Sequence, residues 1–246
     1  MIKIALCYVQ PAHICFPLFQ KMLDKHYSKF SVIYCAFTNE KEPQNYRNFI
    51  EKSQPYTTFV TPNVKRDDWR DEAVNNILEV AQHNKQFTHY LFLEQDFLIG
   101  PDFWDKILEY NRDFIYYSEG GRIHPAFALI QRNIVEGTSR DFFAAPDLGY
   151  DHFGKFFKEV KEKEVGVEIR ELGLIQGVDF YHLAGTTQNY ACFKAGEPFY
   201  KPAEFLSYNY HSFFLPDQNT DWAKLEASII DKHRIGDAPF LEYFFK

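Results

Sequence analysis

Two carboxylates, Glu94 and Asp96, follow an apolar run over residues 89–93 and are separated by a single residue. If the chain stays extended through them, both side chains point to the same side of the strand. Hard oxygen ligands grouped in this way suit Mg²⁺ or Mn²⁺, with diphosphate oxygens and water completing the coordination. Such an ion neutralises charge that develops on a departing nucleoside diphosphate. The pair taken alone also fits a solvated turn, or an Asp96 that caps the next helix.

The elements that must position this pair alternate over the first half of the chain. Apolar runs predict strands over 2–9, 31–37, 56–60 and 89–93. Helical spacing of apolar residues predicts helices over 16–23, 67–81 and 102–110, with a polar helix-like stretch over 43–52. This alternation predicts an α/β fold with a mostly parallel sheet and helices on both faces.

Ligands of such sheets bind at the carboxyl ends of the strands. This rule directs attention to the polar residues that come after each predicted strand: Gln10, Thr38, Glu40, residues 61–63, Glu94 and Asp96. Asp96 is therefore a site candidate on physical grounds, before any family is considered.

The second half of the chain is less regular. Strand patterns occur at 113–117, 125–131, 165–171 and 178–182, and helical patterns at 150–164 and after Asn219 or Thr220. We find no repeat, linker or break in composition, so we expect residues 1–246 to form a single domain.

Composition sets the broad class of protein. The chain has 246 residues, 46% of them hydrophobic and 18% aromatic, which is enough for a large core. The net charge of −7 argues against a broad basic face for nucleic acid, although a local basic groove stays open. No stretch reaches the ~18 apolar residues of a membrane span, and no signal-peptide pattern begins the chain.

Four cysteines lack the spacing of a zinc site or a C-x-x-C pair: Cys7, Cys15, Cys35 and Cys192. We expect free thiols and a reducing, cytoplasmic location.

The segment around Asp96 resembles the D-x-D region of GT-A glycosyltransferases, in which an apolar strand, the D-x-D motif, a proline and a short helix succeed one another. Residues 91–97 correspond to the strand and the motif, with Glu94 in place of the first Asp, and Pro101 with Trp104 matches the proline and the helix. Residues 73–81 are similar to the helix that precedes D-x-D in the large inverting family. Asn75 fits that pattern, while Val74 stands where arginine is common.

This resemblance implies a GT-A-like, Rossmann-type domain that uses a nucleoside-diphosphate sugar, with UDP-sugar the first expectation, and Mn²⁺ or Mg²⁺. Asp96 would be the metal ligand. His182, after a late strand, would be a further ligand, with His152 and His211 as weaker alternatives. The remaining donor-site residues that the resemblance implies are Tyr8, Gln10, Thr38, Glu40, Arg70 (in place of the missing arginine), Asn75 and Glu94.

The resemblance also assigns the acceptor side. It places donor binding in about residues 1–110 and acceptor binding in about 111–246, and it implies direct displacement with an acidic general base. Asp151 is the candidate base and Asp147 the reserve. Either aspartate fits equally well as a helix N-cap, worth roughly 1 kcal/mol. The acceptor itself is left open among a glycan, a lipid-linked sugar, a protein, a small molecule and a modified DNA base.

Two other functions share part of this pattern. A nucleotidyltransferase also places acidic metal ligands at strand ends, but it normally adds a Gly- and Lys/Arg-rich phosphate loop, which residues 9–13 lack. A module that binds a nucleotide or sugar without turnover would need no base.

Overall fold

The computed structural model describes residues 2–10, 16–37, 48, 51–52, 56–60, 69–142 and 153–182. In chain order the elements are β1 (Ile4–Gln10), α1 (Phe16–His26), η1 (Tyr27–Lys29), β2 (Phe30–Phe37), β3 (Thr57–Val60), α3 (Trp69–Ala81), β4 (His89–Leu93), β5 (Phe97–Ile99), α4 (Phe103–Tyr110), β6 (Phe114–Glu119), β7 (Arg122–Gln131), α5 (Arg132–Glu136), α6 (Gly154–Lys163), β8 (Val167–Glu168), η3 (Ile169–Leu172) and β9 (Phe180–His182).

Seven strands form the main sheet in the order β3-β2-β1-β4-β7-β6-β8. The pairs β2–β3, β1–β2, β1–β4 and β6–β8 are parallel, while β7 runs antiparallel to both β4 and β6. The mostly parallel α/β sheet expected from the alternation of elements is therefore confirmed. All of β4 is buried, as its continuous apolar run requires for a strand covered on both faces.

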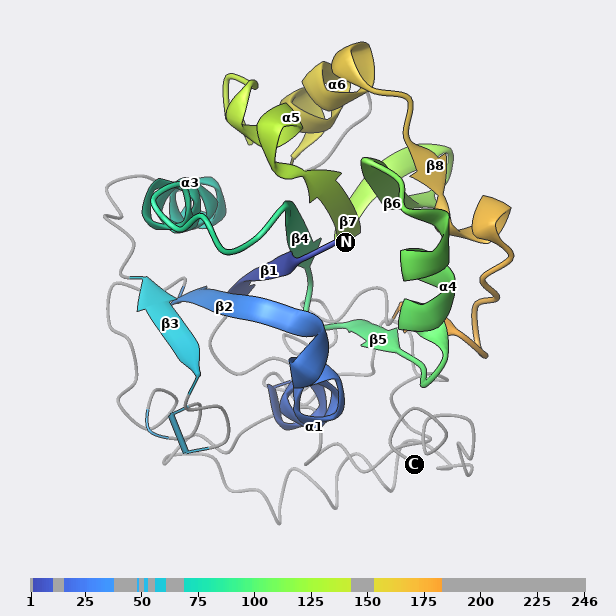
Figure 1. Cartoon of the computed structure of the whole chain (residues 1–246), viewed down its shortest axis with the longest axis horizontal. Helices are drawn as coiled ribbons and strands as arrows, with labels where there is room; N and C mark the ends of the chain where they lie inside the picture. The colour runs from blue at the N-terminus through green and yellow to red at the C-terminus, as the bar shows by residue number, and fades with distance from the viewer. Residues whose placement is uncertain are drawn as a thin grey trace, which may run out of the picture.

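Helices cover both faces of this sheet (Figure 1). On one face α1 and α4 contribute Phe19, Met22 and Trp104 to a core cluster. On the other face α3, α5 and α6 contribute a second cluster, to which Val74, Ile77, Val135, Phe156 and Phe157 belong. The sheet thus lies between two apolar layers, and its upper and lower helices are separated clearly in Figure 1.

A second, two-stranded sheet pairs β5 antiparallel with β9. Gly100, which follows β5, donates its N–H to the Asp179 carbonyl at 2.7 Å. A Cβ at Gly100 would lie 2.8 Å from the carbonyl oxygens of both Val178 and Asp179, closer than such atoms can approach. Glycine at this position therefore allows β9 to lie against the chain that leaves β4.

Strands β6 and β7 form a hairpin closed by Gly120 and Gly121, which have φ of +59° and +79°. Two consecutive positive φ values are the mark of a tight turn that glycine adopts without strain. The pairing is irregular further along. From Tyr116↔Ala128 to Tyr117↔His124, β6 advances by one residue while β7 advances by four.

Two sequence expectations need correction. The strand expected over 165–171 is reduced to Val167–Glu168, because the Glu168 side chain accepts from the Arg170 N–H and starts the 3₁₀ turn η3. The extended chain expected through 94–96 is a turn, described below. Of the helix expected over 43–52, the structure describes residues 48, 51 and 52, which are helical, and the helix expected after Asn219 lies outside the described residues. The division into donor and acceptor halves stays a prediction. Among the described helices, none has the length and apolar character needed to cross a bilayer.

Candidate functional site

The acidic turn between β4 and β5 joins the main sheet to the small sheet. The Glu94 N–H donates to the Ala126 carbonyl of β7 at 3.1 Å, and the Phe97 N–H donates back to the Glu94 carbonyl at 3.2 Å. The Gln95 side chain is buried and donates to the Val9 carbonyl of β1. Glu94 and Asp96 are therefore displayed by a turn that is held to both neighbours of β4. The chain is not extended through them, so the condition of the same-side argument is not met.

Asp96 faces His182 because of the register of the small sheet. Phe97 pairs directly with His182, which places the imidazole next to the residue before Phe97. The Asp96 Oδ1 lies 3.8 Å from the His182 Nε2. The His182 side chain is only 4% exposed, so it forms the floor of the site. The two residues expected to ligate metal are thus brought together.

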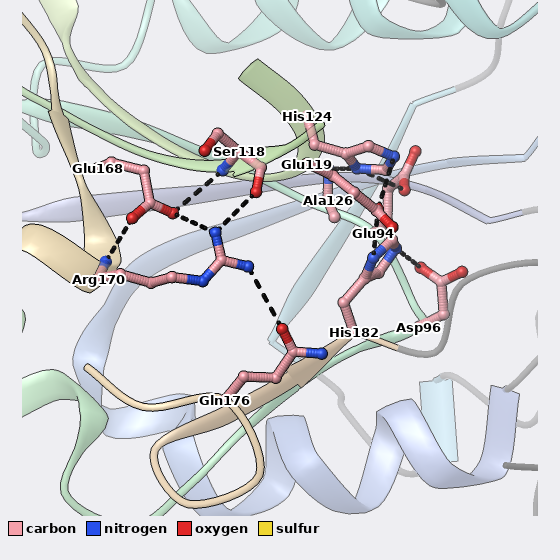
Figure 2. Close-up of polar contacts among 10 residues, drawn as sticks. All are labelled: Glu94, Asp96, Ser118, Glu119, His124, Ala126, Glu168, Arg170, Gln176 and His182. Carbon is pink, nitrogen blue, oxygen red and sulfur yellow. Dashed lines mark hydrogen bonds and ion pairs between the residues drawn. The ribbon is translucent and has the colours of Figure 1, made fainter. Parts of the chain in front are cut away.

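The β6–β7 hairpin adds two residues that the sequence analysis did not single out, Glu119 and His124. The Glu119 Oε2 lies 3.2 Å from the His182 Nδ1 and 4.0 Å from the His124 Nε2. His124 also approaches the acidic turn, with its Nδ1 3.9 Å from the Glu94 Oε2. The two imidazole rings have centroids 4.7 Å apart. Figure 2 shows these side chains converging with Asp96.

A signal for this hairpin is present in the sequence. Gly120-Gly121 between apolar runs is a typical two-residue hairpin loop, and it would have placed Glu119 near the residues that come after the turn. The approach of His124 depends on the bulge in β7, whose sequence mark is Pro125, because proline within a strand occurs at edges or bulges.

Three side chains form a group with the chemistry of a metal site: Glu94, His124 and His182. One carboxylate oxygen and one nitrogen from each ring all lie within 4.8 Å of one another. Ligand atoms at about 2.1 Å from one ion are about 3.0–3.5 Å apart, so a contraction of roughly 1–2 Å would close the group on an ion. The donor set therefore fits a divalent metal, with the Asp96 carboxylate adjacent.

Electrostatics favours a positive charge in this site. Burial alone would lower the pKa of His182, but the Glu119 carboxylate and the charges of Asp96 and Glu94 outweigh burial and raise that pKa above 6.5. When it is protonated, the His182 ring offsets part of the negative charge gathered around it. A divalent cation would offset more of it.

Tyr117 and Arg170 support the floor of the site. Tyr117 packs edge-on against His182 at a centroid distance of 5.4 Å. The Arg170 guanidinium lies 5.0 Å from the Tyr117 ring centroid and donates to the Ser118 carbonyl and to Glu168. Figure 2 shows Arg170 and Glu168 at the left, beside Ser118, and Asp96 at the right. Its hydrogen bonds fix β6 and thereby the hairpin residues of the site.

A cleft opens where the carboxyl ends of β1 and β4 meet α3. Its lining includes Arg70 and Val74 of α3 together with Glu94, Gln95 and Asp96, and Phe153 and Pro125 close its other side. Arg70 is therefore the described cation that shares this cleft with the acidic turn. This is the arrangement that a diphosphate bridging a metal and an arginine would require.

The remaining donor-site candidates are distributed unevenly. Tyr8 borders the cleft, but its ring packs edge-on against Phe19 at 5.0 Å and the residue is 1% exposed, so a base could stack on it only after rearrangement. Asn75 is half-buried on α3 and is not among the cleft-lining residues. Gln10 ends β1. Six further candidates lie outside the described residues: Thr38, Glu40, Asp147, Asp151, His152 and His211.

Comparisons with known proteins find one distant structural likeness to report. No family model matches the chain, and no curated protein matches it. Among solved structures, it is similar to a protein from Desulfovibrio desulfuricans G20 that is provisionally described as a nucleotide-diphospho-sugar transferase. The two chains are 9% identical with a TM-score of 0.41, over 68% of this chain and 80% of the other. A likeness this distant carries no argument about activity.

Proposed function

We propose that this chain is a metal-dependent glycosyltransferase that moves a sugar from a nucleoside-diphosphate sugar, first of all a UDP-sugar, to an acceptor hydroxyl. The observation that carries the proposal is the acidic turn at the end of β4. It presents Asp96 3.8 Å from His182 at one side and shares a cleft with Arg70 at the other. A carboxylate–imidazole pair beside an arginine suits a divalent ion with a bound diphosphate.

The proposed roles are assigned from position. Asp96 and His182 would hold Mn²⁺ or Mg²⁺, with Glu94 next to them. When bound, the ion would neutralise negative charge on the diphosphate leaving group. Arg70 would bind a diphosphate oxygen from the α3 side of the cleft. The nucleoside is expected at the ends of the first two strands, where Gln10, Thr38 and Glu40 occur in the sequence.

The reaction proposed is a displacement at the anomeric carbon. The acceptor oxygen forms a bond to that carbon, the bond from carbon to the diphosphate oxygen breaks, and the electron pair leaves with the diphosphate. The proton of the acceptor hydroxyl passes to a carboxylate, for which Asp151 is the candidate and Asp147 the reserve. General-base catalysis of this type typically contributes ~10²–10⁴-fold.

A donor panel tests the proposal. The wild-type chain is incubated with UDP-, GDP- and TDP-sugars in the presence of Mn²⁺ or Mg²⁺, and release of nucleoside diphosphate is followed by mass spectrometry. We expect turnover or slow hydrolysis of one donor class, abolished by EDTA and restored by the metal. Arg70→Met should weaken donor binding, whereas Arg112→Met, a remote change beside α4, should not.

The alternatives predict other products. A nucleotidyltransferase acting on a nucleoside triphosphate and a sugar phosphate would release inorganic diphosphate. A binding module would retain a nucleotide or sugar without any product. Full activity in EDTA would contradict the metal-dependent proposal.

A further inference from the structure

We infer that His124 is a second imidazole ligand of the metal site, and that this ligand makes the site selective for a transition ion such as Mn²⁺, Co²⁺ or Zn²⁺ over Mg²⁺. The inference deepens the proposed function and rests on it for the presence of an ion. It narrows the expected Mn²⁺ or Mg²⁺ to ions that bind nitrogen well.

The first support is the position of the ring. A nitrogen of His124, a nitrogen of His182 and an oxygen of Glu94 are mutually within 4.8 Å. The three residues come from β7, from β9 and from the turn directly after β4; β7 pairs with β4, and β9 pairs with β5, the strand that follows the turn. The His124 side chain is 31% exposed, so a solvated ion can reach it, while His182 lies beneath at 4%.

The second support is the backbone that aims the ring. Pro125 restricts His124 to an extended conformation and lacks a donor for the sheet. The irregular pairing between Ala128 and His124 sits around this proline. Bulges of this kind commonly re-aim a side chain beside a functional site. The Ala126 N–H donates to the His124 Nδ1 at 3.1 Å, which fixes the ring and leaves the proton of the neutral imidazole on Nε2, facing Glu119. An ion bound to Nδ1 would replace this hydrogen bond.

The third support is the outer carboxylate. Glu119 lies 3.2 Å from the His182 Nδ1 and 4.0 Å from the His124 Nε2, so one side chain faces both imidazoles. Metal-bound histidines are commonly oriented by a carboxylate in this way. An all-oxygen Mg²⁺ site would need no such partner.

Ligand chemistry then sets the selectivity. Imidazole is a good ligand for transition ions, whereas Mg²⁺ prefers oxygen and water and gains little from nitrogen. With two imidazole ligands, the site should bind Co²⁺ more tightly than Mn²⁺, and it should bind both ions far more tightly than Mg²⁺.

The test measures metal binding without donor or acceptor. Free Mn²⁺ is followed by electron paramagnetic resonance as the wild-type chain is titrated, and Mg²⁺ or Zn²⁺ is then added as competitor. We expect Zn²⁺ to displace the bound Mn²⁺ at near-stoichiometric concentration. A roughly 100-fold excess of Mg²⁺ should leave nearly all of the Mn²⁺ bound to the protein. Displacement by equimolar Mg²⁺ would overturn the inference, as would a wild-type chain that binds no Mn²⁺.

Two variants separate ligation from packing. His124→Phe keeps a ring beside Tyr117 and His182 but supplies no nitrogen, and His124→Ala removes the ring. Both should weaken Mn²⁺ binding by roughly 10- to 100-fold while changing Mg²⁺ binding little. His83→Asn, on an exposed residue, is the matched control. Wild-type Mn²⁺ affinity in His124→Phe would refute ligation. If the His124 variants lose Mn²⁺ binding and no donor is turned over, the proposed glycosyltransferase activity fails while His124 remains a ligand. If sugar transfer runs equally well with Mg²⁺ and in His124→Phe, the inference about His124 fails while the proposed activity stands.

Discussion

The two sides of the proposed metal site are built by different means. On the β1–β4 side, the acidic turn follows directly after β4, and it is held by hydrogen bonds from Glu94 to Ala126 and from Gln95 to Val9. On the β6–β7–β9 side, Glu119, His124 and His182 are brought together by a hairpin, a bulge and the register of a two-stranded sheet. The difference teaches that the carboxylates are a local feature of the sequence, whereas the imidazoles depend on tertiary structure.

This difference sets how each side should respond to substitution. Asp96 and Glu94 are only half-buried, so substitution of either carboxylate should have little effect on the free energy of unfolding. The imidazole of His182 is packed among rings, so its removal should affect both the metal and the fold.

Removal of the Asp96 carboxylate is the most severe change for activity. Asp96→Ala should reduce transfer by at least about 10³-fold, because electrostatic stabilisation of the leaving group is a large term in such reactions. Rates of nucleoside diphosphate release are compared with the wild type at saturating Mn²⁺. The thermal midpoint in EDTA should change little; a variant that folds normally and keeps more than a tenth of the activity would contradict the role of Asp96.

His182→Ala should combine two losses. We expect Mn²⁺ affinity to fall by more than the roughly 10–100-fold seen when outer partners of a metal site are removed. The cavity left beside Tyr117 and Phe97 should also lower the free energy of unfolding by about 1–3 kcal/mol. Urea unfolding in EDTA measures the second effect separately. A normal Mn²⁺ affinity in a folded His182→Ala variant would show that the imidazole side of the site does not bind the ion.

Glu119→Gln should have an intermediate effect. The substitution keeps the shape of the side chain but removes the charge that helps raise the pKa of His182. Mn²⁺ affinity should fall by about 10-fold, because outer carboxylates orient their histidines. Nuclear magnetic resonance of the His182 ring in EDTA should show a pKa lower than in the wild type. An unchanged His182 pKa would mean that Glu119 does not act through this ring.

The fold and half of the site could be predicted from the sequence. The strand over 89–93 was predicted with its observed bounds, since an apolar run between polar residues leaves little choice. His182 was singled out only through the family resemblance, because nothing near it shows that β9 will pair with β5. His124 was missed because its position depends on three extra residues in β7 rather than on a local pattern.

Tyr8 illustrates a different limit. Both faces of a central parallel strand are apolar, so the sequence does not show which side each residue takes. The structure places Tyr8 among the residues of the α1 layer and Cys7 in the α3 layer. A residue near the end of a strand can therefore border a ligand cleft while its ring is packed in the hydrophobic core.

The smallest expected effect concerns pH, where His26 on α1 and His182 in the site shift the free energy of unfolding with opposite signs. Burial lowers the pKa of His26, whose Nε2 lies 3.2 Å from the Ile99 carbonyl oxygen. A lowered folded-state pKa means that the unfolded chain binds more protons, so the free energy of unfolding falls as pH drops below about 6.5. His182, with a raised pKa, contributes stability below that pH and loses it as pH rises through its folded-state value.

Urea unfolding in EDTA between pH 5 and pH 8 measures these slopes. His26→Gln should flatten the acid-side loss of stability, since glutamine keeps a donor for Ile99 but does not titrate. A variant with an unchanged slope would show that His26 is not the group responsible.

The central claim is that the acidic turn and the hairpin together form a metal-dependent nucleotide site. Calorimetric titration of UDP into the wild-type chain, with Mn²⁺ and with EDTA, tests it most directly. The account predicts micromolar binding with Mn²⁺, on the order of −7 to −8 kcal/mol, and at least about 10-fold weaker binding in EDTA. Binding of UDP that is equally tight in EDTA, or the absence of any nucleoside diphosphate binding across UDP, GDP and TDP, would contradict it.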